Sequence, residues 1–122
     1  MNVENNFASF WIKSGILYFK YKEDVAIDLA AAMQIVTDRL QLQKGKSYPI
    51  LCDTRGVKSI DMNARRYLAS EGAIFIKAVA LVQNNPLSRI FSEIYVQGNK
   101  PPIPIKICNG TDEALSFLHG YL

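Results

Sequence analysis

Short apolar runs rich in β-branched and aromatic residues alternate along this chain with stretches whose apolar residues recur at helical spacing. The runs predict strands at 7–12, 16–22, 48–52, 73–82 and 103–108. The stretches between them predict helices at 28–43, 62–72, 86–97 and 111–121. The order is therefore β-β-α-β-α-β-α-β-α, which predicts an α/β fold with a mixed sheet of about five strands and helices packed on it.

Capping residues and periodicity define the predicted helices. Asp28, Asp61 and Thr111 stand where an N-cap residue is expected. The residues expected to face the core are Leu29, Met33, Val36 and Leu40 in the first helix and Ala64 and Leu68 in the second. Proline cannot donate to a strand ladder, so the last strand, near Pro101, Pro102 and Pro104, is expected either to lie at an edge of the sheet or to begin late.

Size and charge exclude several classes of protein. The 122 residues suit a single domain, 1–122, and the net charge of +3 comes from scattered basic residues, which argues against a nucleic-acid partner. No apolar run approaches the roughly 20 residues of a membrane-spanning helix, and the first residues lack the features of a secretory signal. Cys52 and Cys108 lie inside apolar runs, which favours buried thiols in a reducing cytoplasm.

Motifs for catalysis or for cofactor binding are missing from the sequence. The glycines form no phosphate-binding loop, and no G-x-S-x-G elbow is present. His119 is the only histidine, so neither a zinc site nor a Cys-His nucleophile is supported. We therefore expect a protein that is not an enzyme and that has no cofactor.

The segment from Asp53 to Asp61 is the best candidate for a binding site. An apolar strand runs there into a polar loop that opens a helix, and ligands of α/β sheets gather outside the carboxyl ends of strands. Arg55, Lys58 and the helix N-terminus could hold an anion. The favoured interpretation is simpler: Asp53 bonds to loop amides and Asp61 caps the helix, and both carboxylates would repel an anion.

Aromatic residues in the first hairpin are a second candidate surface. Tyr18, Phe19 and Tyr21 cannot all face inward, because side chains alternate across a strand, and Trp11 lies close by. If these rings are exposed on an edge hairpin, they form a surface that would bind a partner or a second copy of the chain. Alternatively, one helix covers the second face of the hairpin.

With this order of elements, the chain resembles the STAS domain, the group of the bacterial anti-sigma-factor antagonists and their uncharacterised SpoIIAA-like relatives. The similarity extends over nearly the whole chain, and it rests on the order of elements and on short motifs. The residues that carry it are Ile50-Leu51-Cys52-Asp53, Val57-Lys58-Ser59-Ile60-Asp61, Asn85-Pro86-Leu87, Arg89-Ile90-Phe91 and Asp112-Glu113-Ala114-Leu115. The resemblance implies a SpoIIAA-like sheet and a role in protein–protein interaction.

The regulatory members of that family begin the helix with Asp-Ser-Ser-Gly, and the first serine accepts phosphate. Here the stretch is Asp61-Met62-Asn63-Ala64, and a thioether cannot be phosphorylated. We therefore expect a regulatory or protein-interaction domain without that switch, cytoplasmic and homodimeric. The residues expected to contact the partner are Asp53, Arg55, Lys58, Ser59, Asp61, Met62, Asn63 and Arg66.

A carrier of a small apolar or acyl ligand is the alternative function, and an enzyme of unknown type is the third. Related SpoIIAA-like sheets resemble lipid-binding domains, and a carrier would need a pocket of about 300 Å³ or more between the sheet and the helices.

Overall fold

The computed structural model describes residues 2–83 and 102–122 of the chain. The helix expected between Pro86 and Gly98 lies outside the described residues. The remaining predicted elements are all present, in the predicted order, with three short strands in addition.

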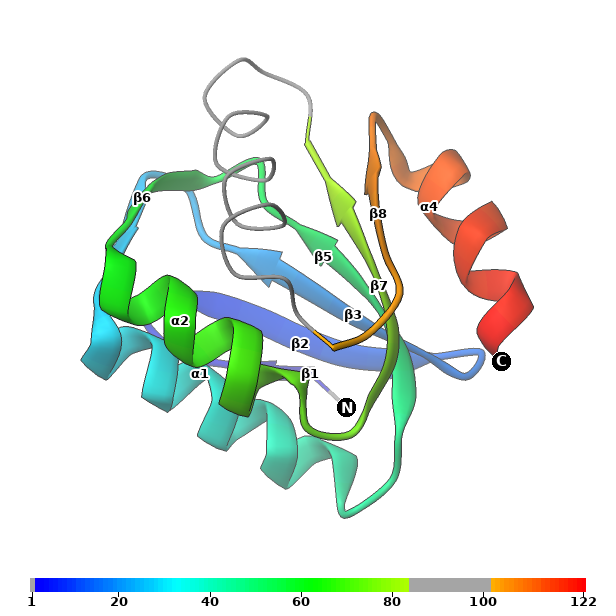
Figure 1. Ribbon diagram of the computed structural model, residues 1–122, viewed down its shortest axis with the longest axis horizontal. Coiled ribbons are helices and arrows are strands. Elements are labelled where there is room, and N and C mark those ends of the chain that lie inside the picture. Colours follow the sequence, from blue (N-terminus) through cyan, green and yellow to red (C-terminus); the bar gives the residue numbers. More distant parts are fainter. Residues whose placement is uncertain (1, 84–101) are drawn as a thin grey trace.

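Among the described residues, the main sheet has six strands in the spatial order β1-β2-β3-β5-β7-β8 (Figure 1). These strands are β1 (Asn2–Glu4), β2 (Ala8–Lys13), β3 (Ile16–Tyr21), β5 (Tyr48–Asp53), β7 (Ile76–Val82) and β8 (Ile105–Cys108). The first three pair antiparallel, and β3, β5, β7 and β8 pair parallel, so the predicted mixed sheet is confirmed. Strand β8 lies at the edge, where the prolines before it predict it.

A separate two-stranded sheet joins β4 (Val25–Ile27) to β6 (Val57–Ile60) in parallel. The sequence pattern predicts a polar loop at residues 57–60 and gives no sign of β1 or β4. All three missed strands have only three or four residues. Segments this short show too little alternation to be recognised as strands.

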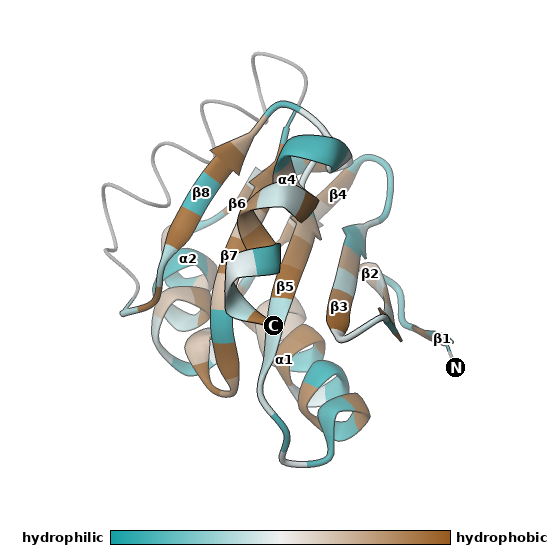
Figure 2. Cartoon of the chain, turned by 90° about the vertical axis from the view of Figure 1, so that its right-hand side faces the viewer, coloured by the Kyte–Doolittle hydropathy of each residue, from teal (hydrophilic) through white to brown (hydrophobic). Residues whose placement is uncertain are grey.

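Helices cover both faces of the main sheet (Figures 1 and 2). They are α1 (Leu29–Gln43), α2 (Met62–Ser70) and α4 (Thr111–Leu118), with the short helices η1 (Glu71–Ala73) and η2 (His119–Tyr121). Residues of α1 and α2 join one buried cluster with Phe10, Leu17 and Phe19, and residues of α4 join a second cluster with Ile16 and Leu51. The sheet is therefore the middle layer between two cores.

Two of the three expected N-caps are confirmed. The Asp28 carboxylate accepts from the backbone N–H of Ala31 at 2.8 Å, and Asp61 accepts from that of Ala64 at 2.8 Å. The prediction for Thr111 is wrong, because Gly110 occupies the N-cap position of α4 without a side-chain bond. Thr111 is instead the first helical residue, and the Glu113 carboxylate accepts from the backbone N–H of Asn109 at 3.0 Å.

The predicted inner face of α1 is also partly wrong. Leu29 and Met33 are 39% and 47% exposed. The residues that α1 buries are Ala31, Ala32, Ile35, Val36, Arg39 and Gln43. The alanines let the helix approach the sheet closely, and the two polar side chains bond to backbone carbonyls of the turn before β7.

The aromatic hairpin is covered on both faces to different degrees. Phe19 and Tyr21 are buried on the α1 side, with ring centroids 4.6 Å apart. Tyr18 lies on the α4 side, where it is half-buried. Its ring stacks on that of Trp11, with the ring centroids 5.4 Å apart. Strand β1 pairs with β2, so the hairpin is not the edge of the sheet. The structure therefore favours the covered hairpin.

Candidate functional site

Strands β4 and β6 place the starts of α1 and α2 side by side. Ile27 pairs with Ile60, and the Asp61 N–H donates to the Ile27 carbonyl at 3.0 Å. Each strand then leads directly into an aspartate cap and a helix. The two helix N-termini therefore share one end of the molecule.

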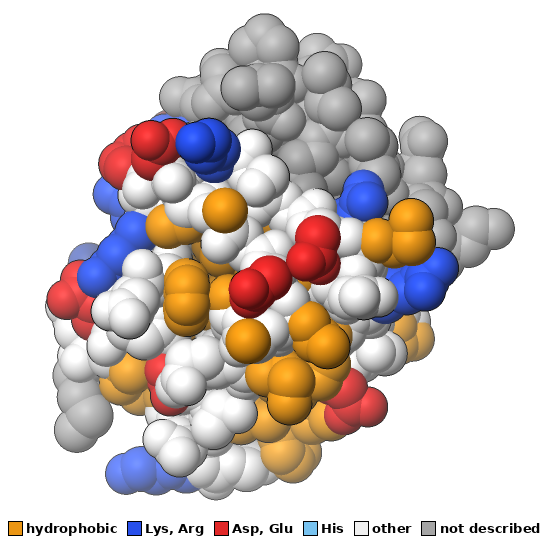
Figure 3. All heavy atoms as spheres, turned by 90° about the vertical axis from the view of Figure 1, so that its left-hand side faces the viewer, with side chains coloured by type: hydrophobic (Ala, Val, Ile, Leu, Met, Phe, Trp, Pro, Cys, Tyr) orange, Lys and Arg blue, Asp and Glu red, His pale blue; other side chains and the backbone are white. Residues whose placement is uncertain are grey.

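Exposed apolar side chains gather at this end. Met62 is 56% exposed at the first position of α2, and Leu29 and Met33 lie on the outer side of α1. Figure 3 shows hydrophobic side chains around a central pair of acidic groups on this side of the molecule. We name the surface formed by Asp28, Leu29, Met33, Asp61 and Met62 the helix-start face. Helical periodicity predicts Leu29 and Met33 in the core, so the sequence gives no sign of their place on this face.

Asp53 and Arg55 form a bidentate ion pair at the carboxyl end of β5. Arg55 Nε lies 2.9 Å from Asp53 Oδ1, and Nη2 lies 2.8 Å from Oδ2. The backbone N–H of Arg55 also donates to Oδ1, at 3.0 Å. Burial alone would raise the pKa of Asp53, but the bonds and charge of Arg55 outweigh it, and the pKa lies below its usual range.

The loop between β5 and β6 is fixed by backbone contacts. Thr54 Oγ1 and its N–H both bond to the Val82 carbonyl, at 2.8 and 2.9 Å. A Cβ atom at Gly56 would collide with the backbone carbonyl of Lys22, so only glycine fits this close approach. Arg55 is thus presented from a rigid loop with about two fifths of its side chain exposed (39%).

The other residues of the predicted contact surface fall into two groups. Lys58 and Ser59 are exposed on β6. Met62, Asn63 and Arg66 are exposed on α2, at the spacing of one helix face. Within residues 2–83 and 102–122, no hydrogen bond or ion pair joins these groups to the Asp53–Arg55 pair. Asp61 serves as a helix cap, as the favoured interpretation expects.

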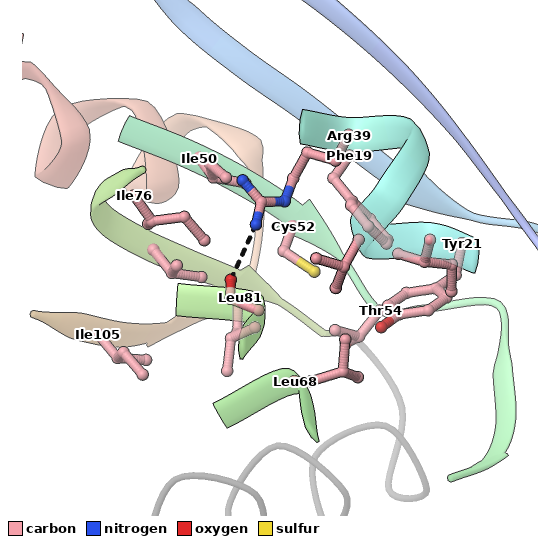
Figure 4. Close-up of a pocket in the computed structure, with 14 residues that line it drawn as sticks. Phe19, Tyr21, Arg39, Ile50, Cys52, Thr54, Leu68, Ile76, Leu81 and Ile105 are labelled. Carbon is pink, nitrogen blue, oxygen red and sulfur yellow. Dashed lines mark hydrogen bonds between the residues drawn. The ribbon is translucent and has the colours of Figure 1, made fainter. Parts of the chain in front are cut away.

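A cavity of about 70 Å³ lies between the sheet and helices α1 and α2 (Figure 4). Most of its lining is apolar, but Arg39, Cys52 and Thr54 also face it. Burial, with a smaller effect of the Asp53 charge, raises the pKa of the Cys52 thiol far above its ordinary value. Cys52 is therefore a protonated, poorly nucleophilic thiol.

The cavity bears on the alternative function. It lies where a carrier would hold its ligand, but its volume of about 70 Å³ is well below the roughly 300 Å³ that such a ligand needs. A space of this size accommodates a few water molecules. The observed sheet–helix cavity does not meet the requirement set for a carrier of acyl ligands.

Neither a metal centre nor a membrane-spanning helix is found in the described part of the chain. Residues 2–83 and 102–122 contain no cluster of three or more histidine, cysteine or acidic side chains that could hold a metal ion. None of the helices described there is both long and apolar enough to cross a bilayer.

Comparison with solved structures identifies the fold. An uncharacterized protein of the DUF3478 family with a SpoIIAA-like fold, from Shewanella loihica PV-4, aligns over 95% of this chain and 98% of its own, with a TM-score of 0.65 and 14% identity. An anti-sigma factor antagonist from Mycobacterium paratuberculosis aligns over 92% of each chain, with a TM-score of 0.66 and 17% identity. The predicted STAS-like, SpoIIAA-like fold is therefore confirmed.

At the level of sequence, no curated protein matches the chain. A family model does, over residues 10–122, which is most of the chain. Since the match includes all the strands of the main sheet except β1 and part of β2, it covers the fold described above. The chain belongs to the family described as a domain of unknown function, DUF7793.

Proposed function

We propose that this chain is a non-enzymatic regulatory domain, 1–122, that binds a protein partner. The contact surface extends from Asp53 to Arg66 and includes the neighbouring helix-start face. The observation that carries the proposal is the exposed Met62 at the start of α2, with exposed Leu29 and Met33 in the first two turns of the adjoining helix α1. Apolar side chains grouped on a surface are a common mark of a protein contact.

The fold supports this choice of surface. One of the solved structures with this fold is an anti-sigma factor antagonist, a name that implies a protein target. The resemblance to that family implies that Met62 stands where its phosphoacceptor serine would be, and we propose that contact here is not switched by a phosphate on that residue. We propose that binding is constitutive and that the Asp53–Arg55 pair supplies an ordered polar edge to the contact.

Location and oligomeric state complete the proposal. Both cysteines are free, which suits the reducing cytoplasm. We propose a homodimer that uses the same apolar surface when no partner is bound. Multi-angle light scattering would then give twice the chain mass of 13.7 kDa for the wild type and the single mass for Met62→Glu.

The decisive experiment maps the contact and then measures it. A photo-crosslinking residue at position 62 should capture a protein in the native cell that the same residue at Ser116, exposed on α4, does not capture. With that protein purified, Met62→Glu and Arg66→Glu should each weaken binding about tenfold or more. A glutamate at the first helical position favours the helix dipole, so the fold is preserved. Equal affinity of wild type and both variants would refute the assigned surface.

A further inference from the structure

Two connections lie together at the end of the molecule opposite the helix starts (Figures 1 and 2). One joins α1 to β5 and contains Lys44 and Lys46, and the other is the turn before β7 that contains Ile74 and Phe75. The Tyr48 N–H donates to the Phe75 carbonyl at 3.3 Å, which holds the two connections side by side. We name the surface of Lys44, Lys46, Tyr48, Ile74, Phe75 and Lys77 the lysine end.

The turn of the lysine end presents two apolar side chains to the outside. Ile74 and Phe75 are 42% and 43% exposed. Phe75 has φ of +60°, a left-handed conformation that a bulky aromatic residue rarely adopts. A phenylalanine at this φ angle is unfavourable for folding. Strained residues of this kind cluster at functional sites, which suggests that the exposed Phe75 ring has a function.

A buried polar network holds this turn rigid from inside. Arg39 Nη1 donates to the Ile74 carbonyl at 3.2 Å, and Gln43 Nε2 donates to the Phe75 carbonyl at 2.8 Å. Gln43 also bonds to the Lys46 carbonyl at 2.9 Å, so one side chain ties both connections. With their backbone fixed, Ile74 and Phe75 lose little further conformational entropy when they are buried by a partner.

Positive charge without an ion-pair partner among the described residues lies on the two connections and at the start of β7. Lys44, Lys46 and Lys77 are exposed, and no carboxylate of residues 2–83 or 102–122 forms an ion pair with them. The Lys46 ammonium lies 5.7 Å from the centroid of the Tyr48 ring. Glu71, the acidic residue nearest in sequence to the turn, is exposed and forms no ion pair with these lysines.

The charge decides what this end can bind. A second copy placed on the same surface would bring lysine against lysine, which is repulsive, so the occupant is anionic. Two apolar side chains at the tip of a turn make a small contact, far below the roughly 800 Å² per partner of a standard protein interface. Projecting apolar tips, an interfacial tyrosine and flexible lysines instead suit a lipid headgroup region.

We propose that the lysine end binds the surface of an anionic membrane. Ile74 and Phe75 insert among the headgroups, and Lys44, Lys46 and Lys77 contact the anionic lipid. The proposal does not depend on the proposed protein partner, because that contact uses the opposite end of the molecule.

Vesicle co-sedimentation of the full chain tests the proposal. Vesicles containing about 30% phosphatidylserine should bind the protein, and pure phosphatidylcholine vesicles should bind it about tenfold more weakly or worse. Binding should fall steeply between about 0.1 M and 1 M salt, because the electrostatic screening length shortens from about 10 Å to about 3 Å over this range. Equal binding to both vesicles, or none to the anionic vesicles at low salt, would overturn it.

Two variants separate the charged and apolar contributions. The double variant Lys46→Gln/Lys77→Gln should bind anionic vesicles about 25-fold more weakly, since each lysine contributes about fivefold. Lys20→Gln, at an exposed lysine on β3, should leave vesicle binding unchanged. Phe75→Asn should lower partitioning about tenfold without loss of thermal stability, because asparagine tolerates a positive φ.

A control at an exposed apolar residue outside both named surfaces completes the test. Leu122→Asn, at the C-terminal residue, should bind vesicles as the wild type does. If Phe75→Asn bound anionic vesicles as strongly as the wild type, the binding would be attraction to any polyanion, and membrane insertion would be refuted.

Discussion

Arg39 Nη2 lies 3.1 Å from the carbonyl oxygen of Gly72, which bonds the middle of α1 to the short helix η1 that follows α2 (Figure 4). The same guanidinium donates to the carbonyl of Ile74 and to the side chain of Gln43. Arg39 is 3% exposed, so its charge is stabilised by these acceptors rather than by water. The network closes one side of the cavity and also shapes the turn before β7.

Arg39→Met is therefore expected to destabilise the fold by about 2–4 kcal/mol. The substitution keeps much of the volume but leaves the carbonyls of Gly72 and Ile74 without their buried donor. Urea unfolding, monitored by circular dichroism, measures the free energy of unfolding. Arg66→Ala, on the exposed face of α2, should change it by no more than about 0.5 kcal/mol. Similar values for the two variants would contradict the structural role of Arg39.

Two leucines should differ in their contribution to stability. Leu118 on α4 is fully buried, and Leu118→Ala should cost about 3–5 kcal/mol. Leu68 is half-buried and already borders the cavity, so Leu68→Ala should cost only about 1–2 kcal/mol. The sequence pattern alone predicts a cost of about 2–5 kcal/mol for Leu68, as for a fully buried leucine. Chemical denaturation of both variants in parallel would distinguish the two expectations.

Periodicity predicted the layered fold because long strands and helices repeat their pattern several times. Strands β3, β5 and β7 have six or seven residues each, enough to show their apolar character. Periodicity failed on α1, since apolar residues occur on more than one side of it. The side that faces the sheet carries Arg39 and Gln43, whose burial depends on carbonyls about 30 residues away in sequence.

The candidate site was predictable in part for the same reason. The bonds of Asp53 to Arg55 and of Asp61 to Ala64 join residues two or three apart, so local sequence rules reach them. The helix-start face depends on the pairing of Ile27 with Ile60, which no local rule gives. The sequence therefore led to the individual residues but not to Leu29 and Met33 beside them.

Gly56→Ala should destabilise the protein by more than about 2 kcal/mol. The added methyl group would meet the backbone carbonyl of Lys22, which cannot move without disturbing the connection between β3 and β4. Gly120→Ala is the matched control, because open space surrounds that position. Differential scanning calorimetry should show a clear fall in Tm for the first variant and little change for the second. Equal Tm values would disprove the close approach.

The thiols should be inert in the folded protein. Burial raises the pKa of Cys52 and of Cys108, so neither is a thiolate near pH 8. Ellman's reagent should titrate no thiol rapidly in native protein and two after addition of guanidinium chloride. Cys52→Ala should leave the native result unchanged. A rapidly reacting thiol in the native wild type would show that the layer over Cys52 opens readily.

The Asp53–Arg55 pair should make part of the stability depend on pH. The folded-state pKa of Asp53 is lowered, so its stabilising effect is complete above the unfolded value of about 3.9 and is lost as pH falls through the folded value. Asp53→Asn should cost about 1–2 kcal/mol at pH 7, modest because Arg55 is partly exposed.

That cost should shrink below about pH 4, because the wild type then loses the charge that the variant lacks. Urea unfolding of both proteins from pH 7 down to the acid limit measures this difference. Asp24→Asn, exposed and at a positive φ that asparagine tolerates, provides the matched control and should follow the wild type. A cost for Asp53→Asn that stays constant into acid would mean that the carboxylate charge contributes nothing to folding, and that the bonds from Arg55 serve only to position its side chain.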